Sequence, residues 1–175
     1  MSTTYPLRPF LPTDTLGLRE LFAQSIEELA QEDYTEDQRA AWASRAEDAA
    51  AFGERLGSMV TLVVEQEGEP LGFGSLRSNS VLDMLYVHPF YAGEGVGTAL
   101  ADALERIAAN RGAQSITADV SDSAAIFFEG RGYVPQERNT IEIDGEWLTS
   151  TTMRKELAAA AGDGKAPVGG KEAGS

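Results

Sequence analysis

The sequence predicts a mixed α/β (α+β) fold in which a central, mostly antiparallel sheet of about six or seven strands is flanked by about four helices. Hydrophobic residues recur at helical spacing in some segments, and other segments are short runs rich in β-branched and apolar residues. The two kinds of segment are interleaved along the chain, which is typical of a sheet covered by helices. The 175 residues are sufficient for one domain with a sizeable hydrophobic core.

The N-terminal half is expected to contain one strand, two helices and three further strands. Residues 5–10 read as an edge strand, because Pro6 and Pro9 are tolerated at an edge. Apolar residues at helical spacing predict a helix from Leu16 and a second helix over about 36–56. Segments rich in β-branched and apolar residues then predict three strands, the first two forming a hairpin, at 59–65, 71–77 and 81–87.

The C-terminal half is expected to alternate helix and strand and to close on a hairpin. Leucines and alanines at helical spacing predict a long helix over 98–109. A strand at 115–120 and a short helix through Glu129 follow. Asp144-Gly145 is a pair suited to a primed turn, and it joins two final strands, at 133–143 and 147–155.

These elements are expected to form a single domain over residues 1–157, followed by a disordered C-terminal tail over 158–175. The tail consists mainly of Ala, Gly, Lys and Pro, and it lacks the apolar periodicity that would let it join a core. The chain shows no internal repeat and no second domain.

The composition excludes several classes of function. The net charge is −14 and no basic patch stands out, so nucleic acid is not an expected partner. With no cysteine and one histidine, His88, neither a thiolate nucleophile nor a metal site is expected. No apolar run reaches membrane-spanning length and no signal peptide is visible, so we expect a cytoplasmic protein with no membrane partner.

The most informative segment is a glycine-rich turn between a predicted strand and a predicted helix. The strand over 81–87 runs into His88-Pro89, and Gly93, Gly95 and Gly97 follow at alternate positions. Glycines let backbone N–H groups approach a ligand, and the start of a helix adds unpaired N–H donors and a partial positive charge. The turn therefore predicts a site for a phosphate-bearing cofactor.

Other interpretations of this turn remain open. It could be a tight strand-to-helix connection that binds nothing, or part of a Rossmann dinucleotide site in which Asp119 holds the ribose. The Rossmann pattern lacks its third glycine, because Leu100 stands in that place. A P-loop is excluded, because no Gly-Lys-Ser/Thr follows the glycines.

Three segments together resemble the GNAT (Gcn5-related) N-acetyltransferase family. They are Leu85 to Leu100 around the glycine turn, Ala124 to Tyr133 in the short helix, and Leu7-Arg8-Pro9 followed by Asp14. The resemblance covers about residues 5–157, which is nearly everything except the tail.

The resemblance implies acetyl-CoA as co-substrate. The pyrophosphate would bind backbone N–H groups of the turn, and the pantetheine arm would pair with the backbone of the preceding strand. The cofactor-binding residues implied in this way are Leu85, Tyr86, Val87, Gly93, Glu94, Gly95, Val96, Gly97 and Thr98.

The chain departs from the family pattern at four positions. Ala92 stands where the family usually has Gln or Arg, and Glu94 stands where it usually has a basic residue. Ser121 replaces a frequent Asn, and Phe128 replaces the tyrosine that often serves as the acid toward the leaving thiolate. Because Phe cannot donate a proton, the usual acid is absent from its usual place.

Amide formation from a thioester requires a neutral amine, so a base is expected near the acetyl group. Asp83 is the leading candidate, because strict alternation along the strand would place it on one face with Leu85 and Val87, with Tyr86 facing away. Tyr133 is the remaining phenol nearest to the expected position of the acid. His88 is a weaker candidate, since His-Pro after a strand more often simply ends it.

The acceptor side is expected to involve Glu27, Glu28 and Tyr34. The two glutamates begin an acidic stretch that extends to Asp37 and would attract a cationic acceptor, and Tyr34, like Trp42, could stack on it. The resemblance thus implies acetyl transfer from acetyl-CoA to a primary amine, in a small cationic molecule or a peptide N-terminus. Direct attack in a ternary complex is favoured, because no cysteine can hold the acetyl group. The alternative is a non-catalytic acyl-CoA-binding sensor module, and the family resemblance also allows a homodimer.

Overall fold

The computed structural model of the protein describes residues 4–158. Seven strands form one sheet: β1 Leu7–Pro9, β2 Val60–Gln66, β3 Glu69–Arg77, β4 Val81–Val87, β5 Ser115–Ser121, β6 Val134–Ile143 and β7 Glu146–Glu156. Five α-helices accompany the strands: α1 Thr15–Leu29, α2 Glu36–Ala43, α3 Ala49–Gly57, α4 Val96–Asn110 and α5 Ala125–Gly130. In the part of the chain that is described, no helix is long and apolar enough to cross a membrane. The predicted tail, 158–175, lies outside the described residues apart from Ala158.

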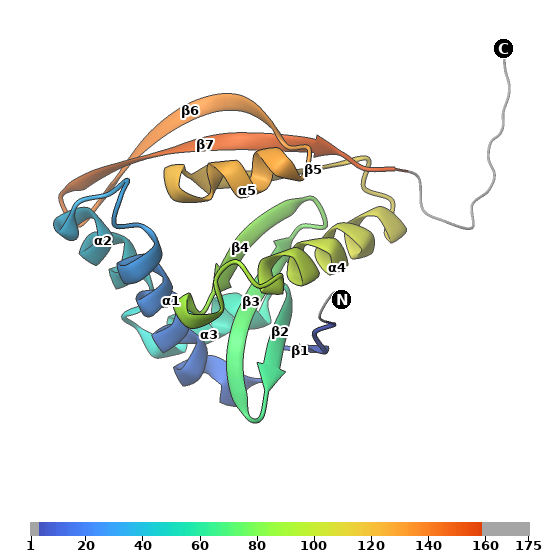
Figure 1. Ribbon diagram of the computed structural model, residues 1–175, viewed down its shortest axis with the longest axis horizontal. Coiled ribbons are helices and arrows are strands. Elements are labelled where there is room, and N and C mark those ends of the chain that lie inside the picture. The colour runs from blue at the N-terminus through green and yellow to red at the C-terminus, as the bar shows by residue number, and fades with distance from the viewer. Residues whose placement is uncertain (1–3, 159–175) are drawn as a thin grey trace, which may run out of the picture.

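The strands lie in the order β1-β2-β3-β4-β5-β7-β6, and each neighbouring pair is antiparallel except β4 and β5 (Figure 1). The predicted mixed fold with a mostly antiparallel sheet is therefore confirmed. The turn between β6 and β7 has positive φ at both Asp144 (49°) and Gly145 (82°), as the primed turn predicted there requires.

Helices cover both faces of the sheet. On one face, α1 and α3 pack against a cluster that contains Phe73 of β3 and Met84 of β4. On the other face, α4 and α5 pack around a cluster that contains Leu82 of β4 and Ile116 of β5. Gly72 allows α4 to begin close against β3, because a Cβ on that glycine would lie only 2.7 Å from Cγ1 of Val96.

The helix predicted over about 36–56 is divided into α2 and α3, which gives five helices where about four were expected. A 3-10 turn, Ser44–Ala46, follows α2. Asp48 then adopts an extended backbone and its side chain accepts a hydrogen bond from the N–H of Ala51, so it begins a new helix. Apolar spacing alone does not show such an interruption, because the periodicity resumes after the turn.

The strands β4 and β5 are joined at a single position. Val81 is paired with Thr117, and the N–H of Thr117 donates to the carbonyl of Ser80 over 2.9 Å. Beyond this position no pairing between the two strands is found within residues 4–158. The sheet is therefore open between the remaining lengths of β4 and β5.

A β-bulge in β4 changes which residues share a face. Ser75 pairs with Met84 and the next residue of β3, Leu76, pairs with Leu82, so Asp83 has no partner of its own. Asp83 and Met84 thus both lie on the face covered by α1 and α3, whereas Leu85 packs with the cluster under α4 and α5. The expectation that Asp83 shares a face with Leu85 and Val87 is wrong, because the bulge interrupts the alternation.

A buried carboxylate ties α4 to the C-terminal strands. Glu105 accepts hydrogen bonds from the Tyr133 hydroxyl over 2.9 Å and from the Lys155 ammonium over 2.8 Å. Arg131 forms a third contact over 2.9 Å, and the Glu105 side chain is only 10% exposed. Three donors, two from the turn between α5 and β6 and one from β7, therefore depend on one carboxylate.

We predict that Glu105→Ala lowers the free energy of unfolding by about 3–5 kcal/mol, because it leaves buried donors and charges unpaired. The matched control is Glu28→Ala on α1, an exposed residue whose loss should change stability by less than about 0.5 kcal/mol. Urea unfolding followed by circular dichroism measures both. Equal stability of the two variants would contradict the structural role of Glu105.

Candidate functional site

The opening between β4 and β5 forms a cavity of about 560 Å³, here called the inter-strand cavity. Its walls are the two strands, the end of α1, the glycine turn and α5. The residues that line it include Leu85, Tyr86 and Val87 from β4, and Gly93, Gly95, Val96, Gly97 and Thr98 from the turn and the start of α4. The sequence-predicted cofactor residues are thus brought together, except Glu94, which is exposed and does not line the cavity.

The glycine turn presents unpaired backbone donors. Gly95 has φ of +92°, a conformation that L side chains rarely adopt, and it directly precedes α4. Among the described residues, the N–H groups of Gly95 to Thr98 have no backbone acceptor, whereas Ala99 donates to the carbonyl of Gly95. The Tyr5 hydroxyl donates to the carbonyl of Glu94 over 3.0 Å and anchors the turn from outside.

The backbone of β4 is also free on the side of the cavity. The N–H of His88 donates to the carbonyl of Leu71 on β3. Because backbone groups of successive residues alternate between the two sides of a strand, those of Leu85 and Val87 face away from β3 and toward the gap. His88 itself ends the strand, since its Nδ1 accepts from the N–H of Phe90 over 3.1 Å, and it does not line the cavity.

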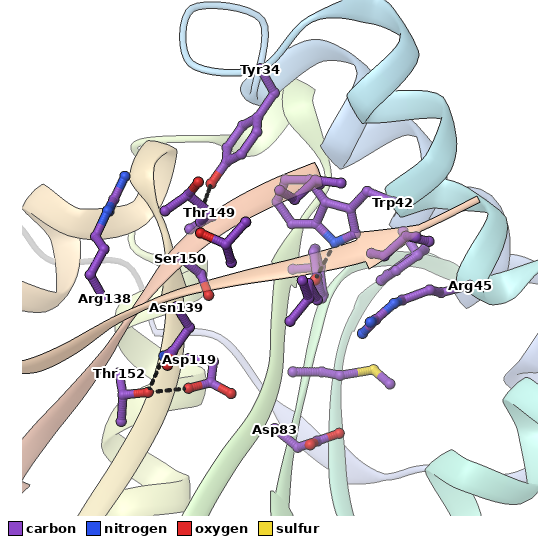
Figure 2. A pocket seen from close by; sticks show the side chains of 18 of the residues that line it. Tyr34, Trp42, Arg45, Asp83, Asp119, Arg138, Asn139, Thr149, Ser150 and Thr152 are labelled. Atoms are coloured by element: carbon purple, nitrogen blue, oxygen red, sulfur yellow. Dashed lines mark hydrogen bonds between the residues drawn. The ribbon is translucent and has the colours of Figure 1, made fainter. Parts of the chain in front are cut away.

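A second cavity of about 590 Å³ lies on the side of the β6–β7 hairpin, and we call it the hairpin-side cavity (Figure 2). Aromatic side chains from α1, α2 and α3 line one part of it, including Phe22, Trp42 and Phe52. Hydroxyl and amide side chains from β6 and β7 line another part, including Asn139 and Thr152. The cavity therefore offers an apolar and a polar surface to one ligand.

The two cavities meet at a set of shared residues: Trp42, Asp83, Met84, Tyr86, Asp119 and Ser121. Two of these are carboxylates in different surroundings. Asp83 is 9% exposed, and its two oxygens accept from Arg55 over 2.8 Å and from Arg77 over 3.2 Å. Asp119 is exposed and has no cation partner in the described chain; one oxygen accepts from Thr152 over 2.7 Å (Figure 2).

Tyr86 is the one tyrosine among residues 4–158 that lines both cavities. Burial raises the pKa of its phenol to about 12, against the opposing effect of the Trp42 N–H and of nearby arginines. The Trp42 Nε1–H donates to the Tyr86 hydroxyl over 3.3 Å. The expectation that Tyr86 faces away from Asp83 is wrong, because the bulge puts both on the same face.

Tyr133 was expected near the reacting atoms, but it lines neither cavity. The Tyr133 hydroxyl donates to Glu105. Burial and the charge of that carboxylate both raise the pKa of the Tyr133 phenol above its ordinary value. Tyr133 is therefore a structural donor beneath α5 and not a proton donor to the site. Phe128 does line the inter-strand cavity, so the acid usual in the family is replaced there by an apolar ring.

The residues expected to bind the acceptor are divided by the structure. Glu27 and Glu28 are exposed and line neither cavity, and Glu27 is paired with Arg39 over 3.3 Å. Tyr34 lines the hairpin-side cavity, but its hydroxyl already donates one hydrogen bond and accepts another within the protein. It donates to the carbonyl of Thr149 over 2.7 Å and accepts from the N–H of Asp122 over 2.9 Å, which ties the segment after α1 to β7 and to the end of β5.

Sequence reasoning missed the hairpin-side contributors: Arg45, Arg55, Arg138, Asn139, Thr149, Ser150 and Thr152. No local motif marks these residues, because they come from a turn between helices, a helix and two distant strands. Asp119 was noted only as a ribose ligand of the Rossmann interpretation, which the observed sheet topology contradicts. The alternation of side chains along β6 and β7 would have placed some of these residues on one face of the hairpin. It would not have shown that this face borders a cavity.

Comparisons with known proteins agree with this geometry. The acetyltransferase (GNAT) domain pattern matches residues 30–157. The uncharacterized N-acetyltransferase YafP of Escherichia coli is 30% identical over 148 residues, which are 85% of this chain and 93% of YafP. A crystal structure of a GCN5-related N-acetyltransferase from Rhodopseudomonas palustris is 51% identical, with a TM-score of 0.88 over 90% of this chain and 98% of that one.

A third similar protein, the PaiA N-acetyltransferase of Thermoplasma acidophilum, was solved in complex with coenzyme A. It shares the fold with a TM-score of 0.72 at 17% identity, over 89% of this chain and all of that chain (100%). The extent of the domain match and the two closer relatives confirm the resemblance found in the sequence: the chain belongs to the GNAT family of acetyltransferases.

Proposed function

We propose that the protein transfers an acetyl group from acetyl-CoA to a primary amine, by direct attack of the amine in a ternary complex. The observation that carries the proposal is that two cavities reach the same gap between β4 and β5. The coenzyme would enter from the glycine turn and the acceptor from the β6–β7 hairpin. Their reacting groups would meet beside Asp83, Tyr86 and Asp119.

Coenzyme binding would rest on the backbone. The free N–H groups from Gly95 to Thr98 and the field at the start of α4 suit the pyrophosphate. The free backbone groups of Leu85 and Val87 suit the amides of the pantetheine arm, which would act as an additional partner for β4. The absence of a basic side chain at Ala92 removes one contact, but it leaves the backbone donors in place.

The reaction requires the amine to lose a proton. An amine with a pKa of about 10.4 is neutral in roughly one molecule in 2,500 at pH 7, so a nearby base raises the reactive fraction. Asp119 is better placed than Asp83, because one of its oxygens is free whereas both oxygens of Asp83 already bind arginines. The ammonium first loses one proton through Asp119 to solvent. As the neutral amine attacks, the C–N bond forms and the C–S bond breaks, its second proton passes to Asp119 and coenzyme A leaves as a thiolate.

Orientation supplies much of the rate in such a complex, because holding two reactants in position contributes roughly 7–11 kcal/mol. A site without the family's tyrosine can therefore still catalyse transfer. Phe128 also supports the second candidate function, a non-catalytic sensor of acyl-CoA. Thiol release distinguishes the enzyme from the sensor. A sensor binds acetyl-CoA but releases no thiol, whichever amine is added.

The acceptor amine belongs to a small molecule or a peptide N-terminus. A purely cationic acceptor has less support, since Glu27 and Glu28 lie outside both cavities. A homodimer and a cytoplasmic location remain predictions from the sequence and the family.

We predict that Gly95→Val weakens acetyl-CoA binding at least tenfold, because a branched side chain disfavours φ of +92° and displaces the free N–H groups. Gly112→Val is the matched control: Gly112 has φ of +95° at the opposite end of α4, away from both cavities. Calorimetric titration with acetyl-CoA measures both variants. An unchanged affinity in Gly95→Val would remove the coenzyme from this turn.

We predict that Asp119→Asn lowers kcat about 100-fold at pH 7 and leaves the Kd for acetyl-CoA unchanged, because Asn keeps the oxygen that accepts from Thr152 but cannot take a proton. Activity should recover as the pH rises and the amine loses its proton unaided. Asp83→Asn is the comparison, and it should reduce stability more than Asp119→Asn does, because it leaves Arg55 and Arg77 without their carboxylate. A larger loss of kcat in Asp83→Asn, with normal folding, would reassign the base to Asp83.

A further inference from the structure

One arginine of the hairpin-side cavity has no partner among the residues that the structure describes. Arg45 lies in the 3-10 turn between α2 and α3, and Figure 2 shows its side chain extending into the cavity. It forms no hydrogen bond or ion pair with any residue from 4 to 158. The other two arginines of the cavity differ, since Arg55 is paired with Asp83 and Arg138 with Asp122.

A second donor without an acceptor among the described residues lines the same cavity. The Tyr86 hydroxyl accepts from Trp42 Nε1–H, which leaves its own proton to donate, and no described side chain or carbonyl receives that proton. The phenol stays protonated across the physiological range, because burial raises its pKa to about 12.

The two groups are complementary to an anion. The chain has 28 acidic residues against 14 basic ones, yet Arg45 is left free of carboxylates where it enters the cavity. A guanidinium presents two parallel N–H groups that match a carboxylate, and a phenolic O–H adds a third donor. Figure 2 shows Arg45 and Asp119 on different sides of the cavity, so an anion and an amine of one ligand would be bound at separate places.

We propose that the acceptor carries a carboxylate in addition to its amine, so that Arg45 and Tyr86 hold the carboxylate while Asp119 receives the proton of the amine. This inference rests on the proposed acetyl transfer and narrows its substrates to small aminocarboxylates, free amino acids among them. The aromatic residues Phe22, Trp42 and Phe52 would then contact the apolar part of the acceptor. A peptide N-terminus, which has no carboxylate next to its amine, would be a poor substrate.

The test uses matched pairs of amines in which the carboxylate is replaced by a neutral amide; because the replacement also makes the amine less basic, binding is compared as well as turnover. Each pair consists of an L-amino acid and its primary amide, for example leucine with leucinamide and phenylalanine with phenylalaninamide. Thiol release from acetyl-CoA gives kcat/KM, and calorimetry in the presence of coenzyme A gives the Kd of each compound. We expect the carboxylate of at least one pair to be preferred about 10- to 100-fold in both measurements, mainly through KM.

Substitutions then assign the preference. Arg45→Gln should abolish the preference for the carboxylate without changing the Kd for acetyl-CoA, and Arg45→Lys should restore part of it. Arg106→Gln is the matched control, because Arg106 is also exposed and unpaired in the described chain but lies on α4 outside both cavities. Tyr86→Phe keeps the aromatic packing and should raise KM more for the carboxylate member of a pair than for its amide.

The outcomes separate this inference from the proposed function. The inference is overturned if no acid binds more tightly than its amide, or if each amide is acetylated as efficiently as its acid. Acetyl transfer to other amines would still stand in that case. A preference that survives Arg45→Gln overturns it as well, because another group would then hold the carboxylate. The proposed function fails on different evidence, namely absence of acetyl-CoA binding or of thiol release with any amine.

Discussion

The shape of the candidate site depends on the point at which pairing between β4 and β5 stops. β4 and β5 are paired only at Val81 and Thr117, although each strand continues for several residues beyond that position. A sheet that stops pairing exposes backbone donors and acceptors, which a protein normally satisfies internally. Here the unpaired backbone of β4 becomes the wall of a cavity, so the same defect that weakens the sheet creates room for a ligand. The two cavities, and the carboxylates between them, all follow from this separation of strands.

The surrounding elements hold the opening in place. On one side, Gly95 starts α4 with a left-handed backbone and Tyr5 fixes the turn through the carbonyl of Glu94. On the other, the Tyr34 hydroxyl connects β7 with the residue that follows β5. The Glu105 network attaches α4 to the last strands without entering either cavity. The polar groups near the site are thus divided between those that maintain its shape and those that remain free for ligands.

The balance of basic and acidic residues in the hairpin-side cavity differs from the balance in the chain as a whole. The protein is strongly acidic, with a net charge of −14, but the hairpin-side cavity contains three arginines and two aspartates. Acidic residues such as Glu27 and Glu28 remain on the outer surface, where they contribute to solubility. Overall composition is therefore a poor guide to the acceptor, because a ligand interacts with the few groups that the fold brings within hydrogen-bonding distance.

Much of the fold follows from local rules that a sequence displays directly. Helical spacing and runs of β-branched and apolar residues located every strand and most helix boundaries, and the glycine turn was recognisable because three glycines at alternate positions stand between a strand and a helix. The backbone part of the site was accessible for the same reason. The side-chain part was not. The bulge at Asp83 exists only in relation to β3, the Tyr133 hydroxyl is bound by a carboxylate 28 positions away, and Arg45 lines one cavity with Tyr86 and Asp119 only because the packing brings distant segments together. By itself the sequence determined most of the secondary structure, the glycine turn and the absence of cysteine, because each depends on neighbouring residues or on composition. Only the tertiary structure decided which acids, phenols and arginines line the two cavities, because that depends on pairing and packing between distant segments.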